Sequence, residues 1–205
     1  MKLYLSPGAC SLSPHIILRE AGIPFDIEQV DGKTKTTKSG ENFLTVNPRG
    51  MVPALQLDNG QILTEGPAIA QYIADMKPEA GLMPKAGSFE RYRVLEWLNF
   101  ISSEIHKQFT PLFKPNTPDD YKTISKENLA KSFKHIDEHL AGKQYLTGET
   151  FTAADAYLFV VTGWSRFQAI DLAPWPNLKA FQERVKARPA VQEAMKAEGL
   201  IKAAA

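Results

Sequence analysis

Cys10 is the only cysteine in this chain of 205 residues, and it stands in a short polar stretch between an apolar N-terminal run and an amphipathic segment. This placement predicts a thiol at the N-terminus of a helix, where unpaired N–H groups and the helix dipole stabilise a thiolate. We therefore expect a pKa below the usual value of about 8.5. Ser13 stands where a dithiol oxidoreductase carries its second cysteine, so a redox step must take its second sulfur from a small soluble thiol. The alternative is a structural cysteine that packs as a small hydrophobic residue.

Two further stretches in the first third of the chain could bind a peptide-like ligand. If the Val52–Pro53 bond is cis, the turn presents the Val52 backbone N–H and C=O outward, ready to pair with an extended ligand. Glu65 and Gly66 begin a predicted helix, whose first N–H groups form an anion site, while the Glu65 carboxylate can take an ammonium. The alternative is an ordinary helix start.

The second half of the chain offers a neutral polar stripe. Asn99, Ser103 and His106 lie at i, i+4 and i+7 and therefore share one face of a helix that begins near Phe89. His106 can exchange a proton near neutral pH and could orient or deprotonate a thiol, unless it is an incidental surface residue. Aromatic residues at helical spacing either line an apolar substrate pocket or belong to the core; they are Phe109, Phe113, Tyr157, Trp164 and Phe167.

The elements that must position these residues change type along the chain. Apolar periodicity and turn residues predict strand, helix and strand over residues 2–30, with parallel strands, followed by an antiparallel hairpin and a helix. Beyond residue 88 only helical periods remain. The predicted strands are 2–5, 25–30, 54–57 and 61–63, and the predicted helices are 15–21, 68–76, 89–113, 118–140, 153–167 and 177–195, with a break at Pro189. Thr152 and Asp155 form a predicted capping box.

This order predicts two domains joined by a connection rich in proline and glycine. The expected boundaries are 1–77 for an α/β domain, 78–88 for the connection and 89–205 for an all-helical domain. Hydrophobic content of 43%, charged content of 23% and a net charge of +1 are typical of a soluble globular protein and point to neither a nucleic-acid nor a membrane surface. The short apolar start is no signal peptide or membrane span, so we expect a cytoplasmic protein.

The whole pattern resembles the cytosolic glutathione transferases, and within them the bacterial beta class. The resemblance covers nearly the entire chain. It rests on the motifs at residues 1–4 and 7–11, Asn47-Pro48-Arg49-Gly50-Met51-Val52-Pro53-Ala54-Leu55, Thr64-Glu65-Gly66, Glu96-Trp97-Leu98-Asn99, His106-Lys107 and Phe151-Thr152-Ala153-Ala154-Asp155-Ala156. It implies a thioredoxin-like βαβ-ββα domain followed by a helical domain, and a cis bond before Pro53.

The resemblance also implies a set of glutathione contacts. They are Cys10, Lys35, Val52, Glu65, Gly66, Asn99, Ser103, Glu104, Ile105 and His106, some of the last four from the second subunit of a homodimer. Many relatives carry Ser where this chain has Gly66, and many activate the glutathione sulfur with a Tyr or Ser hydroxyl where Cys10 stands here. A mixed disulfide with Cys10 is therefore an additional chemistry.

These observations predict an enzyme with glutathione as co-substrate and no metal. It would conjugate glutathione to small hydrophobic electrophiles that enter between the two domains, with Cys10 and His106 as catalytic residues. Cys10 also admits thiol–disulfide exchange or reductive dehalogenation. The alternative is a non-catalytic module that binds glutathione or hydrophobic ligands, or serves assembly, because a fold alone does not define an activity.

Overall fold

The computed structural model describes residues 1–202, which form two compact units. The first comprises residues 1–83 together with the C-terminal segment from residue 187, and the second comprises residues 84–186. The predicted boundaries, 1–77, 78–88 and 89–205, differ from this division in placing the C-terminal segment with the helical domain.

The N-terminal unit is built on a four-stranded mixed sheet in the order β2-β1-β3-β4. β1 (Lys2–Leu5) pairs parallel with β2 (Asp26–Gln29) and antiparallel with β3 (Ala54–Gln56), which pairs antiparallel with β4 (Ile62–Thr64). All four strands and both pairing directions were predicted. The parallel pair requires a crossover connection, which α1 (Leu12–Glu20) supplies.

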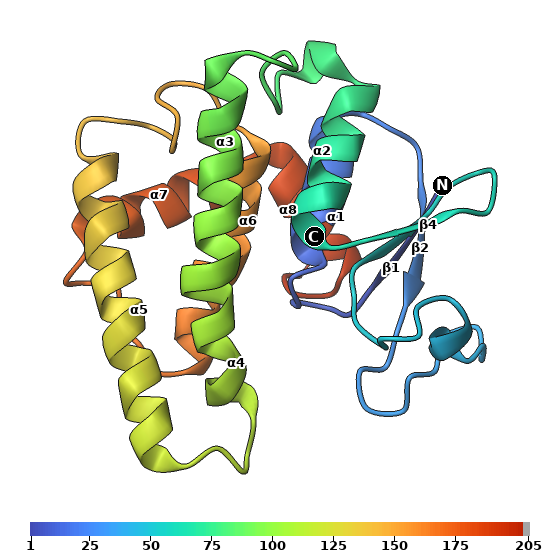
Figure 1. The fold of residues 1–205 in the computed structure, drawn as a ribbon, viewed down its shortest axis with the longest axis horizontal. Helices are drawn as coiled ribbons and strands as arrows, with labels where there is room; N and C mark the ends of the chain where they lie inside the picture. Colours follow the sequence, from blue (N-terminus) through green and yellow to red (C-terminus); the bar gives the residue numbers. More distant parts are fainter. Residues whose placement is uncertain (203–205) are drawn as a thin grey trace. The chain divides into compact units, whose positions relative to one another are not determined.

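Side chains of β1 alternate between the two faces of the sheet, as the pleat requires. Tyr4 packs on one face with Val30, Phe43 and Ala54, while Leu3 and Leu5 are fully buried on the other. α1 packs against α2 (Gly66–Met76) and against α8 (Pro189–Ala197) (Figure 1). α1 is therefore the central helix of this unit.

Gly22 ends α1 through a glycine cap. Gly22 takes a positive φ of 63°, and the N–H groups of Gly22 and Ile23 donate to the carbonyls of Arg19 and Leu18. This is a Schellman cap, which stops the helix and turns the chain into β2.

The second unit is helical. It contains α3 (Phe89–Phe100), a π-helical segment (Ile101–His106), α4 (Lys107–Phe113), α5 (Asp119–Leu140), α6 (Ala153–Gly163), a 3₁₀ segment (Trp164–Phe167) and α7 (Pro176–Lys186). α5 packs against α4 and α7, and α6 packs against α3 and α7. One face of the segment from α3 to α4 is apolar and buried, at Val94, Leu98, Ile101, Ile105, Phe109 and Leu112.

Candidate active site

The polar stretch between β1 and α1 holds Cys10 one residue before the N-cap of the helix, Ser11. The Ser11 hydroxyl accepts a hydrogen bond from the Ser6 N–H and donates to the Ser6 carbonyl, which closes the stretch into a compact loop. Cys10 is half-buried, and its thiol donates to the Val52 carbonyl with Sγ and O 3.3 Å apart. The structure thus joins two of the predicted site residues directly.

The predicted low pKa of Cys10 is wrong. Burial raises the pKa of the thiol to about 11, and the negative charge of Glu65 adds to that increase. The N–H groups of Cys10 and Ser11 lower the pKa, as a helix start should, but they do not offset the loss of solvation. Cys10 is therefore a protonated thiol at neutral pH.

The Val52–Pro53 peptide bond is cis, as the resemblance implied. The Val52 carbonyl meets the Cys10 thiol instead of standing open, whereas the Val52 N–H has no acceptor among residues 1–202. A backbone donor left in this state can pair with a ligand carbonyl.

The loop at residues 47–53 connects the other candidates of the N-terminal unit. Lys35 donates from Nζ to the Gly50 carbonyl over 2.9 Å, and Arg49 forms an ion pair with Glu65, with Nη1 and Oε1 2.7 Å apart. Because Val52 of the same loop meets Cys10, the loop links three predicted site residues: Cys10, Lys35 and Glu65. Arg49 lies inside one of the quoted motifs but was not among the predicted site residues.

Glu65 is the N-cap of α2 and adopts a positive φ of 68°, which is unusual for a residue other than glycine. Its carboxylate is exposed beyond the helix start, and Pro67 follows in the first turn. The Gly66 N–H has no acceptor in the part of the chain that the structure describes. An unpaired N–H at this end of a helix attracts an anion.

The candidates of the second unit fall into different surroundings. Asn99, Ser103 and Glu104 are exposed, and Asn99 donates to the Leu95 carbonyl. Ile105 is fully buried in the core of the unit, so its side chain is structural. His106 is half-buried at the end of the π-helical segment. π-helical turns often occur at functional sites.

His106 belongs to an aromatic cluster of the second unit. Its Nδ1 lies 2.6 Å from the hydroxyl of Tyr157, and its ring meets that of Trp164 edge to face at 4.9 Å. Trp164 also contacts Phe109 and Phe113. Phe109, Tyr157 and Trp164 are buried, which agrees with the core alternative, whereas Phe113 and Phe167 are exposed.

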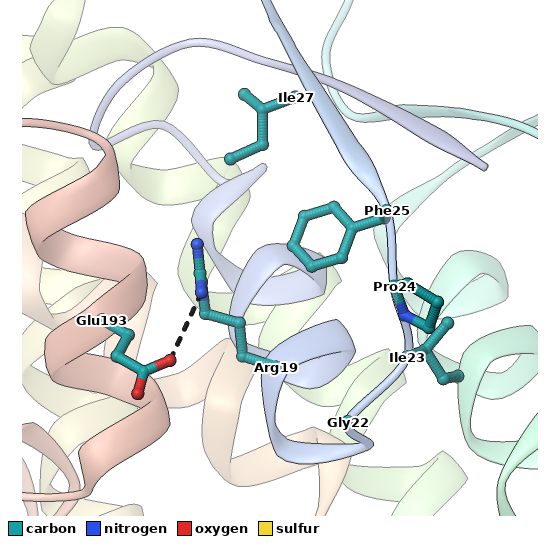
Figure 2. Close-up of a pocket in the computed structure, with 7 residues that line it drawn as sticks. All are labelled: Arg19, Gly22, Ile23, Pro24, Phe25, Ile27 and Glu193. Carbon is teal, nitrogen blue, oxygen red and sulfur yellow. Dashed lines mark hydrogen bonds and ion pairs between the residues drawn. The ribbon is translucent and has the colours of Figure 1, made fainter.

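A separate hollow of about 330 Å³ lies within the N-terminal unit, at the start of β2 (Figure 2). It is lined by Arg19, Gly22, Ile23, Pro24, Phe25, Ile27 and Glu193. None of the predicted site residues lines it. The Arg19 guanidinium reaches toward Glu193, with Nη1 and Oε2 3.3 Å apart.

No metal site and no membrane span accompany these features in the described residues. Between residues 1 and 202 no three His, Cys, Asp or Glu side chains gather as metal ligands would. Over the same residues, each helix is too short or too polar to cross a bilayer.

The mixed sheet with its covering helices, followed by the helical unit, defines a thioredoxin-like domain joined to an all-helical domain. Two family models match the corresponding parts of the chain: "Glutathione S-transferase, N-terminal domain" over residues 8–76 and "Glutathione S-transferase, C-terminal domain" over residues 100–189. The chain belongs to the glutathione S-transferase family, and it is an enzyme of the transferase class.

Individual relatives cover almost the whole chain. Glutathione S-transferase GstA of Escherichia coli O157:H7 is 46% identical over 98% of this chain and 100% of its own length. A beta-class glutathione S-transferase from Sphingomonas chungbukensis is 49% identical with a TM-score of 0.95, covering 98% of this chain and all of that one. A sphingomonad glutathione S-transferase solved in complex with glutathione is 50% identical with a TM-score of 0.94 at the same coverage. The enzyme alternative is thus favoured over the non-catalytic one.

Proposed function

We propose that this enzyme conjugates glutathione to small hydrophobic electrophiles and that Cys10, Lys35, Val52, Glu65 and Gly66 bind the glutathione. The observation that carries the proposal is the loop at residues 47–53, which links Cys10, Lys35 and Glu65 through contacts of 3.3 Å or less. Glutathione offers a thiol, peptide groups, an ammonium and two carboxylates, and each of these has a complementary group in this set.

The unpaired backbone donors assign the orientation of the ligand. The Val52 N–H takes a peptide carbonyl of glutathione, and the Gly66 N–H at the start of α2 takes the γ-glutamyl carboxylate. The Glu65 carboxylate takes the adjacent ammonium as a charge-assisted hydrogen bond. Lys35 supplies a positive charge for the remaining carboxylate. The complex of the sphingomonad relative with glutathione supports this choice of ligand.

Conjugation requires the thiolate of glutathione. The thiolate attacks the electrophilic carbon, a carbon–sulfur bond forms, and the leaving group departs with its electron pair while the thiol proton passes to solvent or a base. A protonated Cys10 can turn its single S–H from the Val52 carbonyl to the developing thiolate, the role that a Tyr or Ser hydroxyl plays in many relatives. Each unit by which the glutathione pKa falls below about 8.5 increases the thiolate at neutral pH by up to about tenfold.

The remaining predicted contacts stay part of the proposal. Asn99, Ser103, Glu104, Ile105 and His106 are proposed to complete the glutathione contacts, Ile105 through its backbone because its side chain is buried. We also propose a cytoplasmic homodimer. Phe89 and Tyr92 on α3 are more than half exposed in the single chain. Exposed apolar side chains of this kind support a subunit interface on this helix. Light scattering should give a mass of twice 22.8 kDa.

The proposal is tested by calorimetric titration of glutathione into the wild type and Glu65→Gln. Loss of the carboxylate should weaken binding by about tenfold or more, the range for one charge-assisted bond. Glu79→Gln is the matched control, because Glu79 is an equally exposed member of an ion pair, with Lys77, in the same unit. Equal affinities in the wild type and Glu65→Gln would make Glu65 a helix-start residue only.

A further inference from the structure

Glu198 is a buried carboxylate that neither the motifs nor the predicted site includes. It lies at the C-terminal end of α8, and its side chain is completely shielded from solvent. Oε2 accepts a hydrogen bond from the Gly8 N–H over 2.9 Å, and Oε1 lies 2.8 Å from Nδ1 of His15. A buried carboxylate has a high desolvation cost, which these two partners offset.

The two partners of Glu198 lie on opposite sides of Cys10 in the chain. Gly8 belongs to the loop before the thiol, and His15 belongs to α1, which follows it. A single carboxylate therefore holds both ends of the segment that carries Cys10. Because loop and helix are held together, the position of the thiol against the Val52 carbonyl depends on this carboxylate.

The neighbours of His15 determine which group can occupy position 198. Arg19 donates from Nε to Nε2 of His15 over 2.9 Å, so Nε2 is an acceptor and the imidazole proton resides on Nδ1. His15 then donates to Glu198, and Gly8 donates to it as well. A glutamine amide at position 198 has only one acceptor oxygen for these two donors, which approach from different directions. Its NH₂ group would therefore face either the Gly8 N–H or the His15 N–H.

The residues that follow Glu198 close over the same glycine. Gly8 has a φ of +73°, and a Cβ atom added to it would lie 3.3 Å from Cδ2 of Leu200. Two backbone hydrogen bonds fix the position of Leu200. The Leu200 N–H donates to the Met195 carbonyl, and the N–H of Gly199, which has a positive φ, donates to the Lys196 carbonyl. The C-terminal segment is thus shaped to fit the loop that carries Cys10.

We propose that Glu198 is a positioning residue for the transferase reaction, which acts through Gly8 and His15 to hold the Cys10 thiol at the glutathione sulfur. The inference rests on the proposed function, because it assigns Cys10 a place beside that sulfur. Glu198 itself touches neither substrate. It determines where the thiol lies, and the loss of its charge should release the loop without removing any residue that contacts glutathione.

The test compares Glu198→Gln with two matched amide variants on the helices it joins. Glu20→Gln removes the charge from the Arg188–Glu20 ion pair, in which Nε and Oε1 are 2.6 Å apart. Like Glu198, this ion pair connects the α8 segment to α1, but Glu20 is not bonded to the loop that carries Cys10. Glu193→Gln removes the exposed partner of Arg19 on the same helix (Figure 2). Thermal unfolding of all three measures the general loss of stability.

The first readout is the rate at which iodoacetamide alkylates Cys10 in the absence of glutathione. Glu198→Gln should react about tenfold faster than wild type, because a released thiol regains solvent and its thiolate fraction rises. Glu20→Gln and Glu193→Gln should react at the wild-type rate, even if their unfolding temperatures fall as far as that of Glu198→Gln. Equal rates in Glu198→Gln and Glu20→Gln would overturn the proposal.

The second readout is steady-state conjugation of glutathione to an activated aryl chloride. Glu198→Gln should raise KM for glutathione or lower kcat so that kcat/KM falls about tenfold, whereas Glu20→Gln should not. Glu198→Asp keeps the charge and should recover part of the lost kcat/KM. If Glu198→Gln does not fold, Glu198→Asp takes its place in the comparison. An Asp variant no better than Gln would contradict the role of the charge. A wild type that does not bind glutathione defeats the proposed function, while the alkylation rates still decide the role of Glu198.

Discussion

Cys10 shows how burial and a helix terminus act on one thiol in opposite directions. The N–H groups at the start of α1 lower its pKa, yet burial raises it to about 11. The sequence places the cysteine correctly before the helix, because the apolar run and the polar break are local signals. It does not reveal the packing of the loop at residues 47–53 against the thiol, since that contact joins positions far apart in the chain.

The reactivity of Cys10 should follow its high pKa. Alkylation by iodoacetamide should be slow at pH 7.5 and rise about tenfold for each pH unit up to about pH 10, because only the thiolate reacts. Free glutathione in the same buffer is the control, with a rate that levels off about two units lower. A plateau for Cys10 near pH 8 would show that the helix terminus outweighs burial.

Thiol–disulfide exchange at Cys10 obeys the same constraint. The Cys10 thiolate should attack one sulfur of oxidised glutathione, so that the intact protein gains one glutathionyl group as the S–S bond breaks and one glutathione thiolate leaves. A reductant should reverse the reaction, and Cys10→Ala should gain no such group. The reaction should accelerate with pH in parallel with alkylation, because the attacking species is the thiolate. Rapid addition at pH 7 would mean that the thiol is more acidic than its burial implies.

His106 is the second residue whose role can be measured directly. His106→Phe removes the polar contact with Tyr157 while keeping a ring beside Trp164. If His106 supports the sulfur or its proton, kcat should fall by about tenfold with a smaller change in glutathione affinity, because the interaction would strengthen as charge develops. Equal kcat in wild type and variant at several pH values would leave His106 a structural member of the aromatic cluster.

At the scale of elements, the sequence predicts most of what the structure contains. Strands, turns and helix starts depend on near neighbours, so the hairpin, the Gly22 cap and the capping box at Thr152 are all confirmed. The helix predicted over 15–21 begins earlier, at Leu12, and two further features were missed. The π-helical segment Ile101–His106 interrupts a predicted continuous helix, and the packing of α8 on α1 is a contact between opposite ends of the chain. Neither leaves a local signal in the apolar pattern.

The capping box at the start of α6 makes a testable contribution to stability. The Asp155 carboxylate accepts from the N–H and hydroxyl of Thr152 and from the N–H of Leu146, each over 2.8 Å. Asp155→Ala leaves these buried donors unpaired and should lower the free energy of unfolding by about 2–4 kcal/mol. Urea unfolding at pH 7 measures this free energy, and a loss of less than about 0.5 kcal/mol would contradict the role of the capping box.

Burial also gives Asp155 a pH dependence of known sign. Its pKa is raised from 3.8 to about 6, so the folded state binds a proton more readily than the unfolded state. The contribution of this group to stability is complete below about pH 4 and is lost as the pH rises to about 6. Asp155→Asn should lack this component, and parallel stability curves of wild type and variant from pH 4 to 6 would contradict the assignment.

At the scale of the whole chain, the C-terminal segment completes the N-terminal unit. Val191, Ala194 and Met195 of α8 are buried, and α8 packs on α1. A chain that ends at Lys186 would expose the apolar surface of α1, so it should unfold at a clearly lower temperature and bind glutathione more weakly. Tryptophan fluorescence during heating checks the first point. An unchanged unfolding temperature would show that residues 1–83 fold without α8.

The most direct test of the account is steady-state conjugation of glutathione to an activated aryl chloride by wild type, Cys10→Ser and Cys10→Ala. The wild type should release one chloride for each S-aryl glutathione formed. A hydroxyl at position 10 should keep kcat within a few fold, and Cys10→Ala should lower it by about tenfold, because the proposed role is hydrogen-bond donation to the sulfur. Glutathione binding without turnover in the wild type would contradict the account, as would a Ser variant as slow as the Ala variant.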